Sequence, residues 1–439
     1  MHFKIFFTFI FLNFVIAQSL LNRAIGEELL YGSSRSFAMG STHSINANNS
    51  SLIRFNPSLL GEILKQNPSF IDLQIHLNSI SERKSILVKD YFGDFLTYAD
   101  YVNNVNMYNY FQGGFLSKVG NMTLGAAYLP LTSFNYNYTE EVRGRADIEE
   151  GDVGLKDPLE GYHQFNSSGV LNTLSFGLSF SNINRNSSQL NVGFSINQTL
   201  DTFIESVFRV DTIRSQFENL AIVDNYSSKQ RLNTKDVFIN FGISYLVNDY
   251  LFSFSMEEDL LIQTDNFSSF NYIDSLGVIS YLDETNSNFI VDGLNYYKPA
   301  KYILGFSYNP IDNSSLTVSS ELEFNNIASK SFNLLQRYYF NDSKHFKFGF
   351  EYLLPSNTPI RAGILYKESN MQNLPDQSII SAGSGGTYGQ LHYDYSVSYT
   401  FYDYYYPDLF VLDADNYANF DKITDSKFNF MFSLKYMLK

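Results

Sequence analysis

Hydrophobic and polar residues alternate along most of the chain. In the segment 189–197, leucine, valine, phenylalanine and isoleucine alternate with glutamine, asparagine, glycine and serine. The segments 345–354, 390–401 and 428–438 repeat this pattern with Phe and Tyr as the main apolar residues. Because successive side chains of a strand point to opposite faces, a period of two predicts half-buried β-strands and not helices.

Alternating segments of this kind number fourteen. We predict strands at 69–80, 108–117, 121–138, 169–183, 187–204, 233–247, 250–264, 299–309, 315–327, 343–354, 360–370, 377–384, 387–402 and 427–438. Short and long connections alternate along the chain. Examples of short ones are Asn248–Asp249 and Gly383–Gly386, and examples of long ones are Thr139–Ser168 and Glu205–Leu232. Short turns on one side and long loops on the other are typical of outer-membrane barrels. We therefore predict an all-β fold, a 14-stranded antiparallel transmembrane β-barrel, over a soluble β-protein.

Composition agrees with this prediction. The 439 residues include 41 Phe and 33 Tyr, which suit a lipid-facing surface with aromatic girdles. The absence of Cys excludes a disulfide scaffold, a thiol nucleophile and cysteine-ligated metal clusters. A net charge of −15 without a basic cluster excludes a nucleic-acid partner.

Acidic residues gather in two of the long connections. Neither group has the glycine and distal glutamate of a calcium-binding loop, so we interpret both as solvated loops and predict no metal site. The groups are Asp147, Glu149, Glu150 and Asp152, and Asp413, Asp415, Asp421 and Asp425.

The first residues have the pattern of a secretory signal peptide. One lysine precedes the apolar run Ile5–Ile16, and Ala17 offers a small residue at the cleavage position. The run is too short to span a bilayer, which needs about 20 residues. We predict a signal peptide at 1–17 cleaved after Ala17, a non-alternating hatch at 18–68 inside the barrel lumen, and the barrel itself at 69–439.

Two stretches of the chain carry a resemblance to a known family. The residues that carry the first match are Gly32, Arg35, Ala38, Met39, Gly40, Asn56, Pro57 and Leu59. These resemble the N-terminal hatch of the FadL-like transporters of long-chain fatty acids and aromatic hydrocarbons, and the related PorV-type barrels of type IX secretion. The stretch 360–395 resembles the closing strands of the same family.

The resemblance implies an outer-membrane channel for passive uptake of small hydrophobic or amphipathic molecules, gated by the hatch. The alternative is a PorV-type barrel that serves as an interaction or shuttle component of secretion. An apolar cavity between hatch and wall would favour transport, and a lumen filled with polar side chains would favour the alternative. The implied partners are outer-membrane lipid, lipopolysaccharide, a hydrophobic ligand and the outer-membrane assembly machinery, with no cofactor.

Pro130 lies inside the predicted strand 121–138. Proline donates no hydrogen bond to a strand ladder, so it predicts a bulge or a local break. The resemblance implies that this break is a lateral gap in the barrel wall through which an apolar ligand leaves; an ordinary bulge near a strand end is the alternative.

Charged residues on the polar phase of the strands are predicted to line the lumen as paired charges. They are His345, Lys347, Glu351, Glu321, Glu323 and Asp394. None of the histidines lies in a Gly-x-Ser-x-Gly or His-Glu-x-x-His context, so we expect no enzymatic activity.

Overall fold

The computed structural model describes most of the chain downstream of the N-terminus. The described residues are 26–29, 32–64, 68–144, 159–185, 188–213, 225–232, 236–262, 269–273, 279–280, 296–310, 315–326, 341–370, 374–407 and 420–438. The predicted signal peptide and its cleavage site lie outside these residues, as do Asp147, Glu149, Glu150, Asp152, Asp413 and Asp415.

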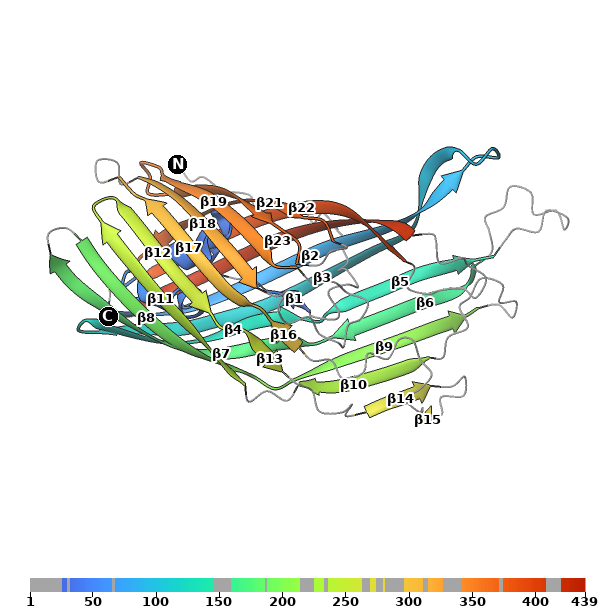
Figure 1. Cartoon of the computed structure of the whole chain (residues 1–439), viewed down its shortest axis with the longest axis horizontal. Helices are drawn as coiled ribbons and strands as arrows, with labels where there is room; N and C mark the ends of the chain where they lie inside the picture. The colour runs from blue at the N-terminus through green and yellow to red at the C-terminus, as the bar shows by residue number, and fades with distance from the viewer. Residues whose placement is uncertain are drawn as a thin grey trace, which may run out of the picture.

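Fourteen antiparallel strands form a closed barrel (Figure 1), as predicted. The strands are β2 (Ser69–Lys89), β3 (Phe95–Val119), β4 (Met122–Ser133), β7 (Val170–Arg185), β8 (Ser188–Thr199), β11 (Val237–Val247), β12 (Tyr250–Glu257), β17 (Ala300–Tyr308), β18 (Leu316–Asn326), β19 (Ser343–Leu353), β20 (Pro359–Lys367), β21 (Gln377–Tyr388), β22 (Leu391–Pro407) and β23 (Phe420–Leu438). Each strand pairs with its neighbours in this order, and β2 pairs with β23 to close the ring. Closure gives every wall strand a partner strand on both sides, as a membrane-spanning sheet requires.

The two faces of the wall differ as the alternation predicts. On β19, Phe346 and Phe348 are 48% and 41% exposed on the outside, whereas His345 and Lys347 are buried on the inside. The same division holds on β2, where Ile71 and Leu73 face outward and Asp72 is buried. An apolar exterior around a polar interior is the arrangement of a transmembrane barrel.

A second sheet lies at the end of the barrel that carries the long connections (Figure 1). Its strands are β5 (Tyr136–Arg143), β6 (Leu159–Ser168), β9 (Thr202–Thr212), β10 (Tyr226–Leu232), β14 (Ser269–Ile273) and β15 (Ile279–Ser280), and a separate pair is formed by β13 (Leu260–Ile262) and β16 (Tyr296–Lys298). The long connections predicted at Thr139–Ser168 and Glu205–Leu232 do lie between wall strands, but they contain strands of their own. These strands form because they bury aromatic side chains: Tyr136 and Phe165 pack together, and the Tyr136 hydroxyl donates to Glu82 of β2.

Two further predictions are corrected by the positions of strand ends. Gly383–Gly386 lies within β21, and the turn comes later, at Gly389 with a φ of 61°. Asp421 and Asp425 belong to β23 and are buried, so they are not part of a solvated loop.

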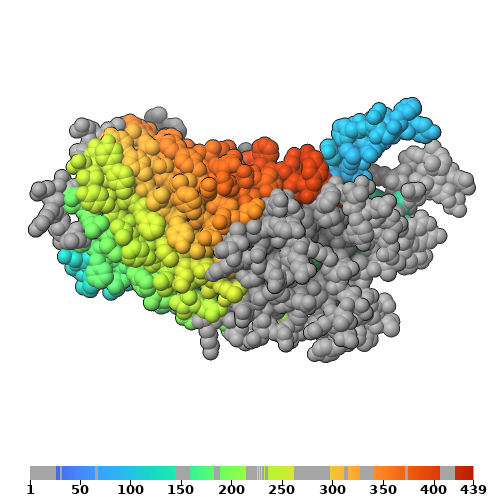
Figure 2. Space-filling model, in the orientation of Figure 1, coloured from blue at the N-terminus to red at the C-terminus, as the bar shows by residue number. Residues whose placement is uncertain are grey.

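Strands β2 and β3 continue beyond the rest of the wall. The pairing of β2 with β23 ends at Ser85, and the two strands go on as a hairpin that protrudes from the molecule (Figure 2). Tyr91 and Phe92 at its tip are 98% and 86% exposed.

Residues 32–64, which we call the luminal segment, lie inside the barrel. They form α1 (Ser34–Ala38), α2 (His43–Asn46), α3 (Leu52–Phe55) and the 3₁₀-helix η2 (Pro57–Leu59). Helix α1 contacts β20, β21 and β22, whereas η2 contacts β7, β8 and β11 on another part of the wall. The luminal segment therefore crosses the lumen from one side to the other.

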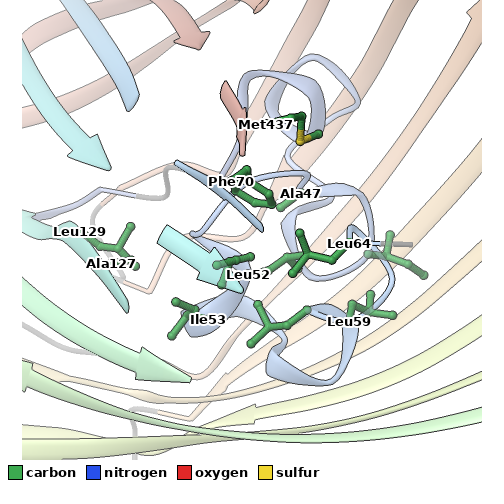
Figure 3. Close-up of a cluster of buried hydrophobic side chains, with 12 residues drawn as sticks. Ala47, Leu52, Ile53, Leu59, Leu64, Phe70, Ala127, Leu129 and Met437 are labelled. Atoms are coloured by element: carbon green, nitrogen blue, oxygen red, sulfur yellow. The ribbon is translucent and has the colours of Figure 1, made fainter. Parts of the chain in front are cut away.

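An apolar cluster holds this segment near the end with the short connections (Figure 3). Leu52, Ile53 and Leu59 of the segment pack with Phe70 of β2 and Met437 of β23. Complete burial of one such side chain contributes roughly 1.5–3 kcal/mol, so the cluster is a substantial anchor.

Candidate functional site

The luminal segment docks against the wall where facing glycines leave room for its backbone. Met39–Gly40 lies against Gly349 of β19 and Gly363 of β20, which are register partners. A Cβ at either wall glycine would come closer than 3.0 Å to the backbone of Met39 or Gly40. Gly40 also has a φ of 69°, which side-chain-bearing residues rarely adopt. The Met39–Gly40 stretch thus fits the wall by close backbone approach.

A second glycine pair receives the Asn56–Pro57 stretch. Gly193 of β8 and Gly242 of β11 are also register partners, and a Cβ on either would overlap Pro57 or the Asn56 side chain. Within the luminal segment, Asn56 donates from Nδ2 to the Ser44 carbonyl at 2.9 Å. The Gly32 carbonyl is held by Gln74 and Gln112, at 2.9 and 2.8 Å.

One set of luminal charges joins helix α1 to the wall. Arg35 donates two hydrogen bonds to Glu351 of β19, from Nη2 at 2.7 Å and from Nε at 3.0 Å. Arg361 of β20 bonds the same carboxylate and, at 2.6 Å, Asp394 of β22. Asn48 donates to Asp394 at 3.1 Å. The predicted residues Arg35, Glu351 and Asp394 are therefore brought together in one network.

A second set lies beside helix α2. The buried carboxylate of Glu321 accepts hydrogen bonds from Ser44 Oγ at 2.8 Å and from the Ile45 backbone at 3.0 Å. Lys347 pairs with Glu321 at 3.2 Å and with Glu323 at 2.7 Å, and His345 Nδ1 lies 3.2 Å from Glu323. All six predicted lumen-lining residues face inward.

Further charges were not singled out from the sequence. Arg54 of α3 pairs with Glu257 at 2.9 Å, which also pairs with Lys298 at 2.9 Å. Glu257 and Lys298 lie at strand ends, where the alternation gives a weak signal, and Arg54 lies on a helix, where it gives none.

The short strand β1 (Glu27–Glu28) is held in the lumen by ion pairs. Glu27 pairs with Lys427 of β23 at 2.7 Å, and Glu28 pairs with Lys301 of β17 and with Arg54 at 3.5 Å. These contacts tie both carboxylates of β1 to basic side chains of the wall and of the luminal segment.

β1 also fills a break in the wall. Strands β3 and β4 pair from Val119 and Met122 as far as Gly113 and Tyr128, and no further. Beyond this point β4 pairs with β1 instead, with Glu27 opposite Ser133 and Glu28 opposite Thr132. A bulge against β7 lies between Pro130 and Thr132. Pro130 thus lies where the partner of β4 changes from β3 to β1.

A cavity of about 160 Å³ lies in the lumen on the side of the long connections. Its lining includes β1 and Thr132, so it reaches the seal at the wall break. Apolar contributions come from Phe37, Leu365 and Ile379, and polar ones from lysine, glutamate, asparagine and hydroxyl groups. The cavity is therefore mixed in character and not the apolar chamber expected for a transporter.

Within the described part of the chain, no group of histidine and carboxylate side chains is arranged to hold a metal ion. No helix in that part has the length and apolar character needed to cross a bilayer.

Comparisons with known proteins agree with the architecture. No protein-family model and no curated protein sequence matches the chain. Among solved structures, a FadL homologue of Pseudomonas aeruginosa matches with a TM-score of 0.61 at 13% identity, over 94% of this chain and 100% of that one. The Pseudomonas putida toluene transporter TodX gives 0.55 at 14% identity, over 94% and 99% of the two chains. The Ralstonia pickettii toluene transporter TbuX gives 0.52 at 14% identity, over 93% and 98%. The chain has the fold of the FadL-like transmembrane barrels.

Proposed function

We propose that the protein is an outer-membrane channel for passive uptake of small hydrophobic or amphipathic molecules, without enzymatic activity, and that the luminal segment and β1 gate it. The observation that carries this proposal is the break between β3 and β4, sealed by β1 beside a lumen cavity. The similar fold of the two toluene transporters supports the same class of ligand.

In this proposal the observed geometry is the closed state of the channel. The luminal segment blocks the way to the end with short connections, and β1 blocks the way through the wall. Release of β1 from β4 would join the cavity to the break at Pro130, which would then serve as the lateral gap. A ligand leaving there would enter the bilayer without crossing the polar lumen, so no energy source is needed.

The proposal includes location in the outer membrane. Lipid and lipopolysaccharide would surround the wall, and the outer-membrane assembly machinery would be a partner in biogenesis. Export would begin with the signal peptide at 1–17. The aromatic alternation of the last strand suits recognition by that machinery.

A secretion-partner role is the second candidate. The densely polar lumen is the feature that this alternative predicted, and the exposed Tyr91 and Phe92 at the β2–β3 tip give a partner a contact surface. Stable co-purification with a secretion component, together with no uptake activity, would favour it.

The proposal is tested by uptake of labelled toluene in a bacterial strain that lacks its own hydrocarbon channels. We expect the full-length protein to raise uptake severalfold above the empty vector, and Pro130→Val, which restores a ladder donor at the break, to reduce that gain. A matched substitution, Leu124→Val, alters an exposed position of the same strand and should leave uptake unchanged. No gain in uptake from correctly inserted full-length protein would contradict the channel function.

A further inference from the structure

Among the described residues that line the lumen cavity, Lys367 is the lysine whose ammonium lacks a close counter-charge. Lysines 298, 367 and 427 line it together with Glu27 and Glu28. Lys298 is paired with Glu257, Lys427 with Glu27, and Glu28 with Lys301 and Arg54. The ammonium of Lys367 has no carboxylate within 4.0 Å and no hydrogen-bond acceptor among the described residues.

The carboxylates that act electrostatically on Lys367 are already engaged. Glu27 and Glu28 act on it only as more distant charges, while their close contacts go to Lys427 and Lys301. Lys367 is the last residue of β20, and its register partners are His345 on β19 and Gln377 on β21, which bring no negative charge. Lys367 is partly buried, and an anion beside it would replace the hydration that its ammonium has partly lost.

Apolar side chains surround the same space. Leu365 lies on β20 two residues before Lys367, Phe37 comes from helix α1, and Leu374, Pro375 and Ile379 come from the start of β21 and the residues just before it. The cavity thus offers one cationic group and an apolar surface next to it. This combination matches an amphipathic anion better than a neutral hydrocarbon.

The volume limits the size of the ligand. About 160 Å³ is close to the roughly 150 Å³ of a cavity that holds benzene, and it is below the roughly 300–1,000 Å³ of sites for larger ligands. A six-membered ring fits within this space, whereas most of an extended long-chain fatty acid would lie outside it. Size therefore selects a small acid from among amphipathic anions.

We propose that the cavity is a binding site for small monocarboxylates of benzoate size, in which the ligand carboxylate pairs with Lys367 and the ring packs against the apolar lining. The inference rests on the proposed channel function and narrows its substrate class. Lys427 does not serve as the anchor because Glu27 already holds it, so the ligand carboxylate adds to the existing ion pairs without breaking one.

The test measures binding of benzoate and of toluene to the purified full-length chain in detergent by equilibrium dialysis. Lys367→Met keeps the length of the side chain and removes its charge. We expect it to weaken benzoate binding by about tenfold or more, because a hydrogen bond to a charged group contributes about 1.5–3 kcal/mol, and to leave toluene binding unchanged. Lys367→Arg should retain benzoate binding, as should Lys89→Met, a control at the exposed end of β2.

Equal benzoate affinity in the wild type and in Lys367→Met would overturn the proposal. A parallel loss of toluene and benzoate binding in Lys367→Met would also overturn it, because Lys367 would then maintain the cavity and not recognise the charge. Binding and uptake are separate readouts: benzoate binding that depends on Lys367 stands even if toluene uptake fails, and toluene uptake stands even if benzoate does not bind.

Discussion

At the scale of single residues, the lumen is organised by ion pairs that link distant parts of the chain. Arg35 and Glu351 are 316 positions apart in sequence, yet they form a two-point contact inside the barrel. The charges in such pairs give up hydration in exchange for a fixed partner. Removal of one member leaves the other charge buried without a partner, so stability falls by far more than the net contribution of the pair. Their value here lies in fixing the luminal segment in one position.

Lys347 offers a direct test of this view. It stands between the buried carboxylates of Glu321 and Glu323. Lys347→Met would leave both with less countercharge, and we expect the free energy of unfolding to fall by about 3–5 kcal/mol. Urea unfolding in detergent micelles, followed by circular dichroism because the chain has no Trp, measures the change.

The double variant Lys347→Met/Glu323→Gln serves as the control for charge. Removing one carboxylate together with the lysine should restore part of the lost stability. If the single variant were as stable as the wild type, the ion pairs would not fix the lumen.

The sequence allowed these side chains to be placed on the inner face but not to be paired. The period of two puts His345, Lys347 and Glu351 on one side of their strand, and they lie there. Which carboxylate meets which lysine depends on the luminal segment, whose contacts run over hundreds of residues and follow no local periodicity. The sequence pattern carries no information of that kind.

At the scale of elements, strand register places single glycines opposite one another, and the pairs form docking sites for the luminal segment. Gly349 and Gly363 lie opposite each other on β19 and β20, so their missing side chains form one space that receives Met39–Gly40. Gly193 and Gly242 do the same for Asn56–Pro57. Glycine on the inward phase was visible in the sequence, but its pairing across strands needed the register.

Gly363→Ala should displace the luminal segment from the wall. The added Cβ would overlap the Gly40 backbone, which is part of a chain held on both sides and has little freedom to move. We expect the variant to fold as a barrel and to show higher conductance in planar bilayers than the wild type.

Ala362→Val is the matched control because it adds bulk at the neighbouring, outward-facing position of β20. Unchanged conductance in Gly363→Ala, with normal insertion, would show that the close contact does not hold the segment in place.

At this scale, the sequence predicted which wall strands exist but not where they end. The alternation located all fourteen wall strands because one face of each meets lipid. Strands β5, β6 and β9 were missed or joined to others, since their burial comes from packing outside the membrane, where nothing enforces the regular pattern. For the same reason β2 and β3 continue well past their predicted ends.

At the scale of the whole molecule, a closed ring of strands is hard to reconcile with lateral exit of a ligand. Every wall strand has two partners, but β4 meets β3 over only part of its length and takes β1 for the rest. Because β1 comes from the N-terminal segment and not from the wall, its release would open the break while the other strand pairs remain intact. The membrane-spanning ring is thus compatible with the proposed gate.

Locking β1 onto β4 is the decisive test of this gate. Glu28 lies opposite Thr132, and antiparallel partners have Cα atoms about 4.5–5.5 Å apart, within the range that a disulfide bridges. The chain has no Cys of its own, so Glu28→Cys/Thr132→Cys forms a single defined cross-link. We expect toluene uptake through the oxidised double variant to fall to the level of the empty vector and to recover when the disulfide is reduced.

The two single variants control for loss of Glu28 and of Thr132 and should respond to neither oxidation nor reduction. Full uptake through the cross-linked protein would show that β1 stays in place during transport, and the exit would then have to be sought elsewhere in the lumen.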